Sequence, residues 1–430
     1  MSLVIRGGRV IDQKGERKID VEIGDDGRIA AVGTGLSAEA DLDASGCIVS
    51  PGFVDLHAHL RQPGQEEAET IETGARGGSL GGYTALVAMP NTEPATDSVA
   101  VVEQVRSLGR ESMCEIVPSA AMTVERAGED MAPMGELVDA GVGIFTDDGT
   151  GLQDPRLMRR IMEYSTGLTG RLGRPVILAQ HCEVSALSAG GFMHEGEWSS
   201  RLGIPGQPAE AEELMVMRDI ALVRLTGAHM HFQHLSTASS VAMVRGAKAA
   251  GLPVTAEATT HHFTLTDAAC ASYDPVFKVH PPLRTDEDVA AIKEGLADGT
   301  IDAVATDHAP HAPHVKERPF DEAPPGMLGL ETAFSLTLTE SGLDLPEVLA
   351  VLSWRPAAIA GLTDRHGIFV EPGAPANLCV IDPDETWTVS GAAMASRSLN
   401  TPYEGRSLRG RVRHTIRAGE PVVVDGEACR

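Results

Sequence analysis

The chain has 430 residues, of which 42% are hydrophobic and 22% charged, a composition typical of a globular protein with a sizeable core. Its 61 acidic and 35 basic residues give a net charge of −26, which argues against nucleic acid or an anionic membrane as a partner, because both need a basic footprint. No apolar run reaches the roughly 18–20 residues of a membrane span. Six scattered cysteines without a C-x-x-C pair favour reduced thiols, so we expect a cytoplasmic protein.

The two ends of the chain are rich in short strand patterns. Residues 1–50 contain VIRGGRVID and IDVEIGDDGRIAAVG, in which Val and Ile flank a hairpin-type turn at Asp26-Gly27. From about residue 366 onward, ANLCVIDPDETWTV and RVRHTIRAGEPVVV have the same character and are broken by Gly, Pro and Asp. We predict that residues 1–50 and 366–430 pair into one small β-sandwich domain.

Residues 51–365 alternate strand patterns with helical patterns such as SVAVVEQVRSLG and EAEELMVMRDIALVRL. Several strand candidates are nearly continuous apolar runs, as strands buried on both faces require. The candidates lie at residues 48–57, 83–89, 114–122, 141–147, 175–181, 230–236, 253–259 and 301–307. Eight parallel strands with crossover helices make a (β/α)8 barrel, so we predict an α/β protein with a TIM-type barrel as its catalytic domain.

Histidines and aspartates gather at the predicted carboxyl ends of these strands, where the active site of such a barrel lies. The first strand ends in His57 and His59, whose spacing puts both imidazoles on one face. The other strand ends carry Asp147, Asp148, His181, His234, Asp307, His308 and His311. Imidazole and carboxylate without thiolate suit zinc, and six ligands suit two ions that share a carboxylate and a hydroxide. Such a pair activates water and polarises a carbonyl, which implies attack on an amide-like carbon or its reversal.

Several motifs carry a resemblance to a known family: VDLHAHLRQPG, MPNTEP, FTDDG, ATDHAPHAPHVK, GLET and the closing SLNTPYEGRSLRGRVRHTIRAGEPV. They resemble the amidohydrolase superfamily and, within it, the dihydroorotases of the bacterial type I class. The resemblance implies two Zn²⁺ ions per subunit, the first bound by His57, His59 and Asp307, the second by His181 and His234, with Asp148 and a hydroxide as bridges. The residue pattern leaves Asp147 as the alternative bridge, and the resemblance favours Asp148.

A long segment without lysine bears on the alternatives. Many relatives in the superfamily bridge their metals with a carboxylated lysine, but this chain has no lysine between Lys18 and Lys248. This argues against another cyclic-amide hydrolase of the hydantoinase or allantoinase kind. A catalytically silent homologue that scaffolds aspartate carbamoyltransferase is the other alternative, and it conflicts with the complete set of ligand positions.

The resemblance also implies the reaction, which is the reversible cyclisation of N-carbamoyl-L-aspartate to (S)-dihydroorotate plus water in de novo pyrimidine (UMP) biosynthesis. Asp307 is then the catalytic proton relay, and Arg61, Asn91 and His311 resemble the family's set for the substrate carboxylate. His280 stands where the family usually has Asn, and Pro325-Gly326 where it has Phe-Gly. The expected substrate contacts are His59, Arg61, Asn91, His280, His311, Pro325 and Gly326.

The remaining histidines are expected to have structural roles, namely His229, His231, His261 and His262. Besides the small-molecule substrate, we expect a second copy of the chain as partner in a homodimer. An association with aspartate carbamoyltransferase is a further option.

Overall fold

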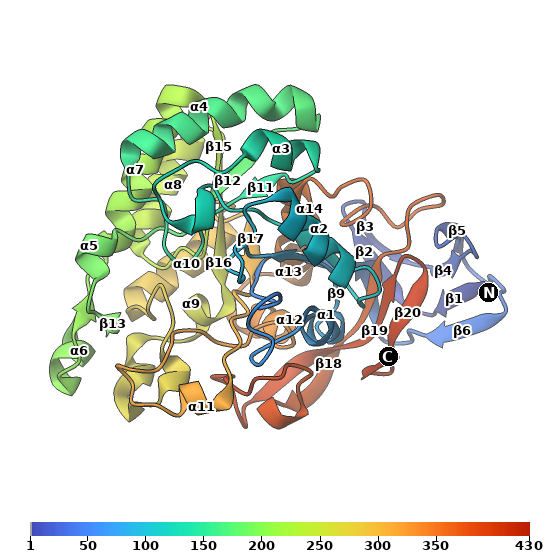
Figure 1. Ribbon diagram of the computed structural model, residues 1–430. Helices are drawn as coiled ribbons and strands as arrows, with labels where there is room; N and C mark the ends of the chain where they lie inside the picture. Colours follow the sequence, from blue (N-terminus) through green and yellow to red (C-terminus); the bar gives the residue numbers. More distant parts are fainter. Residues whose placement is uncertain (1) are drawn as a thin grey trace.

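The structure is a computed structural model that describes residues 2–430. Its larger part is a barrel of parallel strands surrounded by helices (Figure 1). In chain order the barrel strands are β8 (Phe53–Ala58), β9 (Tyr83–Ala88), β10 (Glu115–Pro118), β11 (Ile144–Phe145), β12 (Ile177–Gln180), β15 (His229–Phe232), β16 (Val254–Thr259) and β17 (Ala303–Ala305). Each of the eight strand patterns found in the sequence contains one of these strands, so the predicted barrel is confirmed. The first pattern, 48–57, also contains β7 (Ile48–Pro51), which belongs to a sheet outside the barrel.

Parallel pairing links consecutive barrel strands. β8, β9 and β10 form one sheet, and β11, β12, β15, β16 and β17 form another. Two isolated parallel bridges, Ala120 with Phe145 and Ala58 with His308, join the sheets at both seams. The strands therefore follow one another around the barrel, and their carboxyl ends open at one mouth.

Several barrel strands are shorter at the carboxyl end than their sequence patterns predicted. The pattern at 114–122 gives a strand that ends at Pro118, and the pattern at 301–307 gives one that ends at Ala305. The residues beyond these ends leave the hydrogen-bonded ladder because they form the loops that line the mouth.

Helices follow the strands along the chain, and most of them cover the outside of the barrel and return the chain from one strand to the next (Figure 1). They are α1 (Ile71–Leu80), α2 (Val99–Leu108), α3 (Met134–Asp139), α4 (Pro155–Leu172), α5 (Ser185–Ser188), α6 (Glu197–Leu202), α7 (Glu210–Thr226), α8 (Ala238–Ala249), α9 (Thr260–Thr264), α10 (Asp286–Ala297), α11 (Pro313–Lys316), α12 (Ala333–Glu340), α13 (Leu345–Leu352) and α14 (Trp354–Ala360). The predicted helices at 98–109 and 210–225 are α2 and α7. Among residues 2–430, no helix combines the length and apolar character needed to cross a membrane.

Helix α4 shows how local sequence sets the element boundaries. The side chain of Asp154 accepts a hydrogen bond from the backbone N–H of Arg156, and Pro155 occupies the first turn, where a missing N–H costs nothing. The helix ends at Gly173, whose φ of 77° is the left-handed conformation that glycine adopts without strain.

The two ends of the chain form a two-layer β-domain beside the barrel (Figure 1). One layer contains β1 (Leu3–Arg6), β4 (Asp20–Ile23), β5 (Ile29–Gly33) and β6 (Ala40–Asp43). The other contains β2 (Arg9–Asp12), β3 (Gly15–Lys18), β7 (Ile48–Pro51), β18 (Leu378–Thr388), β19 (Ser407–Arg417), β20 (Glu420–Val424) and β21 (Glu427–Ala428). Buried aliphatic side chains such as Ile5, Val21 and Val380 pack into one core cluster. The predicted sandwich of both chain ends is therefore present.

Residues 185–207, between β12 and α7, form an excursion that the sequence analysis did not anticipate. It contains α5, α6 and the short paired strands β13 (Met193–His194) and β14 (Gly206–Gln207), and it projects from the barrel in Figure 1. Met193 packs with Cys270 and Phe320, which fastens the excursion to later loops. Its last residue, Gln207, reaches the mouth of the barrel.

Candidate metal centre and substrate pocket

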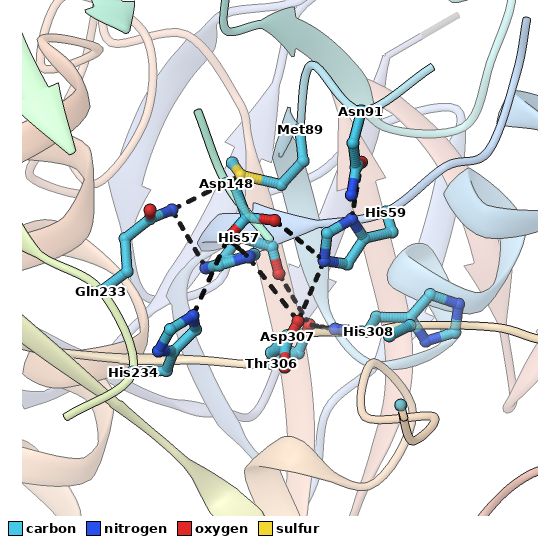
Figure 2. Close-up of polar contacts among 12 residues, drawn as sticks. His57, His59, Met89, Asn91, Asp148, Gln233, His234, Thr306, Asp307 and His308 are labelled. Atoms are coloured by element: carbon cyan, nitrogen blue, oxygen red, sulfur yellow. Dashed lines mark hydrogen bonds and ion pairs between the residues drawn. The ribbon is translucent and has the colours of Figure 1, made fainter. Parts of the chain in front are cut away.

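Four side chains from three strand ends meet at the centre of the barrel mouth. His57 and His59 at the end of β8 point toward Asp148, which follows β11, and toward Asp307, which follows β17 (Figure 2). His57 Nε2 lies 3.2 Å from Asp148 Oδ1 and 3.6 Å from Asp307 Oδ1. His59 Nε2 lies 3.1 Å from Asp307 Oδ1 and 3.5 Å from Asp148 Oδ2. All four side chains are buried.

His181 and His234 approach Asp148 from neighbouring strands. His181 Nδ1 and His234 Nε2 lie 3.7 and 3.8 Å from Asp148 Oδ1, and 2.9 Å from each other. In two triplets, His57–Asp148–His234 and His57–His59–Asp307, the potential donor atoms all lie within 4.8 Å of one another. The structure therefore brings all six predicted ligand positions to one small volume.

Two atoms in this volume have no hydrogen-bond partner. His57 Nε2 and Asp148 Oδ1 are both buried, and neither makes a hydrogen bond with any of residues 2–430. The two atoms lie 3.2 Å from each other without forming a hydrogen bond. A buried polar atom without a hydrogen bond is costly, whereas the same two atoms are ordinary ligands of a divalent transition metal. The residues present therefore fit a metal centre.

Adjacent aspartates in FTDDG play different parts. Asp147 Oδ1 accepts hydrogen bonds from the backbone N–H groups of Met122 (2.8 Å) and Thr123 (3.1 Å), and its Oδ2 accepts one from the Thr123 hydroxyl. Asp147 is thus engaged with the loop after β10, while Asp148 faces the histidines. The geometry favours Asp148 over Asp147 as the shared carboxylate.

Hydrogen bonds outside the cluster orient the first two imidazoles. His57 Nδ1 lies 3.0 Å from Glu257 Oε1, and His59 Nδ1 lies 2.9 Å from Asn91 Oδ1. Each Nδ1–H can donate to its oxygen, which leaves Nε2 with its lone pair directed into the cluster, as a metal ligand requires. Glu257, on β16, was missed in the sequence analysis, although a carboxylate inside an apolar strand pattern was a signal that could have found it.

Buried carboxylates determine the charge that this centre favours. Burial by itself would lower the pKa of His57 and His181, but Asp148 and neighbouring acids outweigh it, raising the pKa of His57 and bringing that of His181 to about 10. Burial would raise the pKa of Asp148, but the surrounding histidines, His57 foremost, hold it well below its usual range. The centre therefore stabilises positive charge, whether on imidazolium or on a divalent cation.

The cluster forms one wall of a cavity of about 210 Å³. Every predicted site residue except His57 borders this cavity, and His57 is completely buried beside it. Drug-sized ligands usually occupy ~300–1,000 Å³, so this cavity suits a small, compact metabolite.

Arg61 provides a cation next to the metal-ligand cluster. It is 8% exposed, its Nε donates to the carbonyl of Pro310 at 3.2 Å, and it borders the cavity. Burial lowers its pKa to about 10, so it stays charged near neutral pH. A buried guanidinium can bind a ligand carboxylate through two parallel hydrogen bonds.

Three of the site residues have unusual backbone conformations. Arg61, His234 and Asp307 have φ values of 58°, 31° and 44°. Such left-handed conformations are uncommon outside glycine and cost on the order of 1–3 kcal/mol, and they cluster where function requires a side chain to point in a set direction. Each of these residues leaves a strand and turns its side chain toward the cavity.

Asn400 was not found from the sequence, yet it connects the loops at the edge of the cavity. Its Oδ1 accepts from the N–H of His311 (3.2 Å), and its Nδ2 donates to the carbonyls of Ala309 (2.9 Å) and Gly326 (3.1 Å). It is buried and belongs to the segment between β18 and β19. An asparagine in a loop gives no sequence signal of these contacts.

The positions that depart from the family pattern lie at the edge of the cavity. His280 Nε2 lies 2.9 Å from Gln207 Nε2, which ties it to the excursion before α7. The carbonyl of Pro325 accepts from His311 Nε2 at 2.7 Å. Gly326 has a φ of 143°, and a Cβ there would lie 2.8 Å from His311 Nε2, so only glycine fits this position.

The other histidines lie outside this set. His231 Nε2 lies 3.0 Å from Glu257 Oε2, so it supports the carboxylate that holds His57. His262 lies between the hydroxyl of Thr259 and the carbonyl of Pro281. Both contacts agree with the structural roles expected for these two residues.

A parallel barrel with histidines and carboxylates at its carboxyl mouth fits the class of metal-dependent amidohydrolases. A family model described as "Dihydro-orotase-like" matches residues 46–240. The chain is 48% identical over 438 residues to a dihydroorotase of Mycobacterium tuberculosis and 47% identical over 434 residues to one of Streptomyces coelicolor, and each comparison covers 99% of both chains. The chain belongs to the dihydroorotase family.

Solved structures of other cyclic-amide hydrolases share the fold. An L-hydantoinase from Arthrobacter aurescens superposes with a TM-score of 0.87 at 23% identity, covering 100% of this chain and 97% of its own. A D-hydantoinase from a Thermus species gives 0.83 at 24% identity, covering 99% and 96%. At this level of identity the likeness shows the architecture alone.

The two aspartates can be separated by metal analysis. Asp148→Ala removes the carboxylate that faces four histidines, so we expect it to lose about one metal equivalent per chain, since coordination requires that charged oxygen. Asp147→Ala is the comparison variant, which keeps the Asp148 carboxylate but releases hydrogen bonds that position its backbone, so we expect a smaller loss of metal. Elemental analysis of the folded variants checks this. If Asp147→Ala loses metal and Asp148→Ala keeps it, the metal ligand is Asp147 and not Asp148.

Asn400 is expected to position the substrate loops without touching the metals. Asn400→Ala should raise KM about 5- to 10-fold, because each lost hydrogen bond is worth about 1 kcal/mol and two loops are released, while kcat and metal content change little. Asn377→Ala is a matched control, because Asn377 also links two backbone groups, the carbonyl of Arg365 and the N–H of Ala418. Equal KM values for Asn400→Ala and Asn377→Ala would show that Asn400 has only a structural role.

Proposed function

We propose that the protein catalyses the reversible cyclisation of N-carbamoyl-L-aspartate to (S)-dihydroorotate with loss of water, as a step of pyrimidine biosynthesis. The observation that carries this proposal is the position of the buried Arg61 beside the cluster of four histidines and two aspartates, in one compact cavity. Substrate and product each combine a free carboxylate with an amide carbon that must react, so they need both features within a short distance.

Arg61 binds the substrate carboxylate in this proposal. Its Nε donates to the carbonyl of Pro310, which leaves its two terminal nitrogens for the ligand carboxylate. Asn91 and His311 border the same cavity and supply further polar contacts. Because Asn91 also accepts from His59, it fixes the distance between the carboxylate site and the reacting carbon.

Asp307 moves the proton. Its Oδ1 lies against His59, which leaves Oδ2 as the atom that exchanges the proton. During ring opening, Asp307 takes a proton from the attacking water and passes it to the ring nitrogen as the C–N bond breaks and the C–O bond forms. During cyclisation the same proton returns from the carbamoyl nitrogen to the leaving oxygen, so the carboxyl group is restored after each turnover.

We propose two Zn²⁺ ions as the metals, the first held by His57, His59 and Asp307, the second by His181 and His234, with Asp148 between them. When bound, such ions lower the pKa of water and polarise the carbonyl. The ligand types support this assignment, since all of them are imidazole nitrogens or carboxylate oxygens. Asp148 would supply the carboxylate shared by both ions, and the chain has no lysine between Lys18 and Lys248 that could take this role in carboxylated form.

We also propose a cytoplasmic location and a homodimeric assembly. Six free cysteines, five of them buried, suit a reducing cytoplasm. For a homodimer, the exposed apolar side chains of Leu214, Met217 and Leu225 on α7 are the supporting surface. Association with aspartate carbamoyltransferase stays a proposal that rests on the family resemblance.

The reaction itself is tested by assaying the purified protein with N-carbamoyl-L-aspartate and, in parallel, with a hydantoin that has no carboxylate. We expect cyclisation of the former, its loss on chelation and its return with added zinc, because the cluster needs divalent charge to act. Full activity of metal-free protein, faster turnover of the hydantoin, or no turnover at all in zinc-loaded protein would each contradict the proposal.

Carboxylate recognition is tested at Arg61. Arg61→Met keeps an unbranched stem but loses the guanidinium and its charge, so KM for N-carbamoyl-L-aspartate should rise about 10- to 100-fold, as expected for a charge-assisted hydrogen bond of roughly 1.5–3 kcal/mol. Metal content should be unchanged because Arg61 is not a ligand. An unchanged KM would place the carboxylate site elsewhere in the cavity.

A further inference from the structure

A second polar cleft lies at the opposite, amino-terminal mouth of the barrel. Helix α14 closes that mouth, where Ala357 and Ala360 belong to the same core cluster as Val54 and Ile144, which lie near the amino ends of β8 and β11. Beside it is a cavity of about 230 Å³ bordered by Arg106, Arg174 and Arg365. In a chain with a net charge of −26, such a concentration of guanidinium groups is unexpected.

Arg174, just before β12, is the central cation of this cleft. Its guanidinium fits between two glycines, since a Cβ on Gly143 would lie 2.1 Å from its Nη2 and a Cβ on Gly361 would lie 2.3 Å from its Nε. The two glycines leave a slot that any larger residue would fill. The planar guanidinium of Arg174 thus lies in a slot of matching shape at the surface of the barrel.

No protein group neutralises Arg174 directly. Among residues 2–430, its guanidinium takes part in no hydrogen bond and no ion pair, and it is only partly exposed. Partial burial and the charge of Arg365 lower its pKa. The acid that acts on it from a distance, Asp364, is already 2.8 Å from Arg365 Nη1. A half-buried cation without a counter-charge is a costly arrangement that a bound anion would relieve.

The acidic side chains that border or flank the cleft already pair with basic side chains of the protein. Glu115 receives Arg365 Nε at 2.9 and 3.0 Å and His366 Nε2 at 2.8 Å. Burial opposes its ionisation, but these partners bring its pKa down to about 2, so the carboxylate stays ionised and paired. Arg106 uses Nη1 for Glu103 and for the carbonyl of Ala140, which leaves its Nη2 free to face a ligand beside Gly141.

We propose that this cleft binds a phosphate-type oxyanion, held mainly by Arg174 and assisted by Arg106. A tetrahedral anion offers several acceptor oxygens, and guanidinium forks match phosphate geometry better than a single ammonium does. The anion comes either as free phosphate or as the phosphate group of a small metabolite. Because the cleft is bordered by β10, β11 and the turn after α14, its ligand joins the barrel to the segment that leads into the β-domain.

Binding is measured on the metal-loaded protein by calorimetry and by thermal denaturation, with inorganic phosphate and, separately, a nucleoside monophosphate as probes. We expect saturable binding and a rise in Tm that grows with ligand concentration. Arg174→Gln should weaken binding at least about tenfold by removing the charge-assisted fork. Gly143→Ala should weaken it as well, because the new methyl group displaces the guanidinium while keeping its charge.

Arg171→Gln is the matched control, because Arg171 lies three residues away, is exposed and already pairs with Asp139. It should bind like the unmodified protein. Tighter binding of the nucleotide than of phosphate identifies a metabolite as the ligand, and equal binding identifies the free anion, and both support the cleft. No saturable binding, equal binding by Arg174→Gln and the unmodified protein, or binding abolished by Arg61→Met but kept in Arg174→Gln would each overturn it.

Discussion

The parallel pairing of the barrel strands is the constraint on which the rest of this structure depends. It places the carboxyl ends of all strands at one mouth, so residues that are 248 positions apart, such as His59 and Asp307, meet at 3.1 Å. No local contact could achieve this, because a single strand offers only two side chains on one face per three residues. The ring of strand ends therefore converts a scattered set of histidines and aspartates into one centre.

Bringing the histidines together at one mouth does not by itself determine which nitrogen of each imidazole faces the centre. Imidazole has two nitrogens, and the one that faces the centre is set by what the other one contacts. Glu257 and Asn91 perform this task for His57 and His59, and each belongs to a different strand or loop from the histidine that it orients. The interior of the barrel is consequently as much part of the site as the mouth, and the fully buried carboxylate of Glu257 has a role there as the partner of His57.

Much of this could be predicted from sequence because it follows from periodicity and strand ends. Apolar runs mark the barrel strands, and the residues just after them are directed to one mouth whatever the loops do. No comparable sequence rule predicts contacts between distant loops. Asn400 reaches Ala309 and Gly326 from the β-domain side, and the excursion at 185–207 brings Gln207 to His280, through tertiary packing that no local pattern encodes. Motif resemblance favoured Asp148 over Asp147, but residue chemistry alone could not separate two adjacent carboxylates.

The pair Asp147–Asp148 shows how a short acid after β11 reaches the histidine cluster. An aspartate carboxylate extends only one carbon beyond Cβ, so the backbone after β11 must lie close to the histidines. Asp147 holds the backbone there, since it accepts hydrogen bonds from two N–H groups and a hydroxyl of residues 122–123. Gly149, with a φ of 85°, then lets the chain turn away immediately. One acid therefore fixes the backbone so that the next can reach the centre, and the loop after β10 supplies the groups that anchor it.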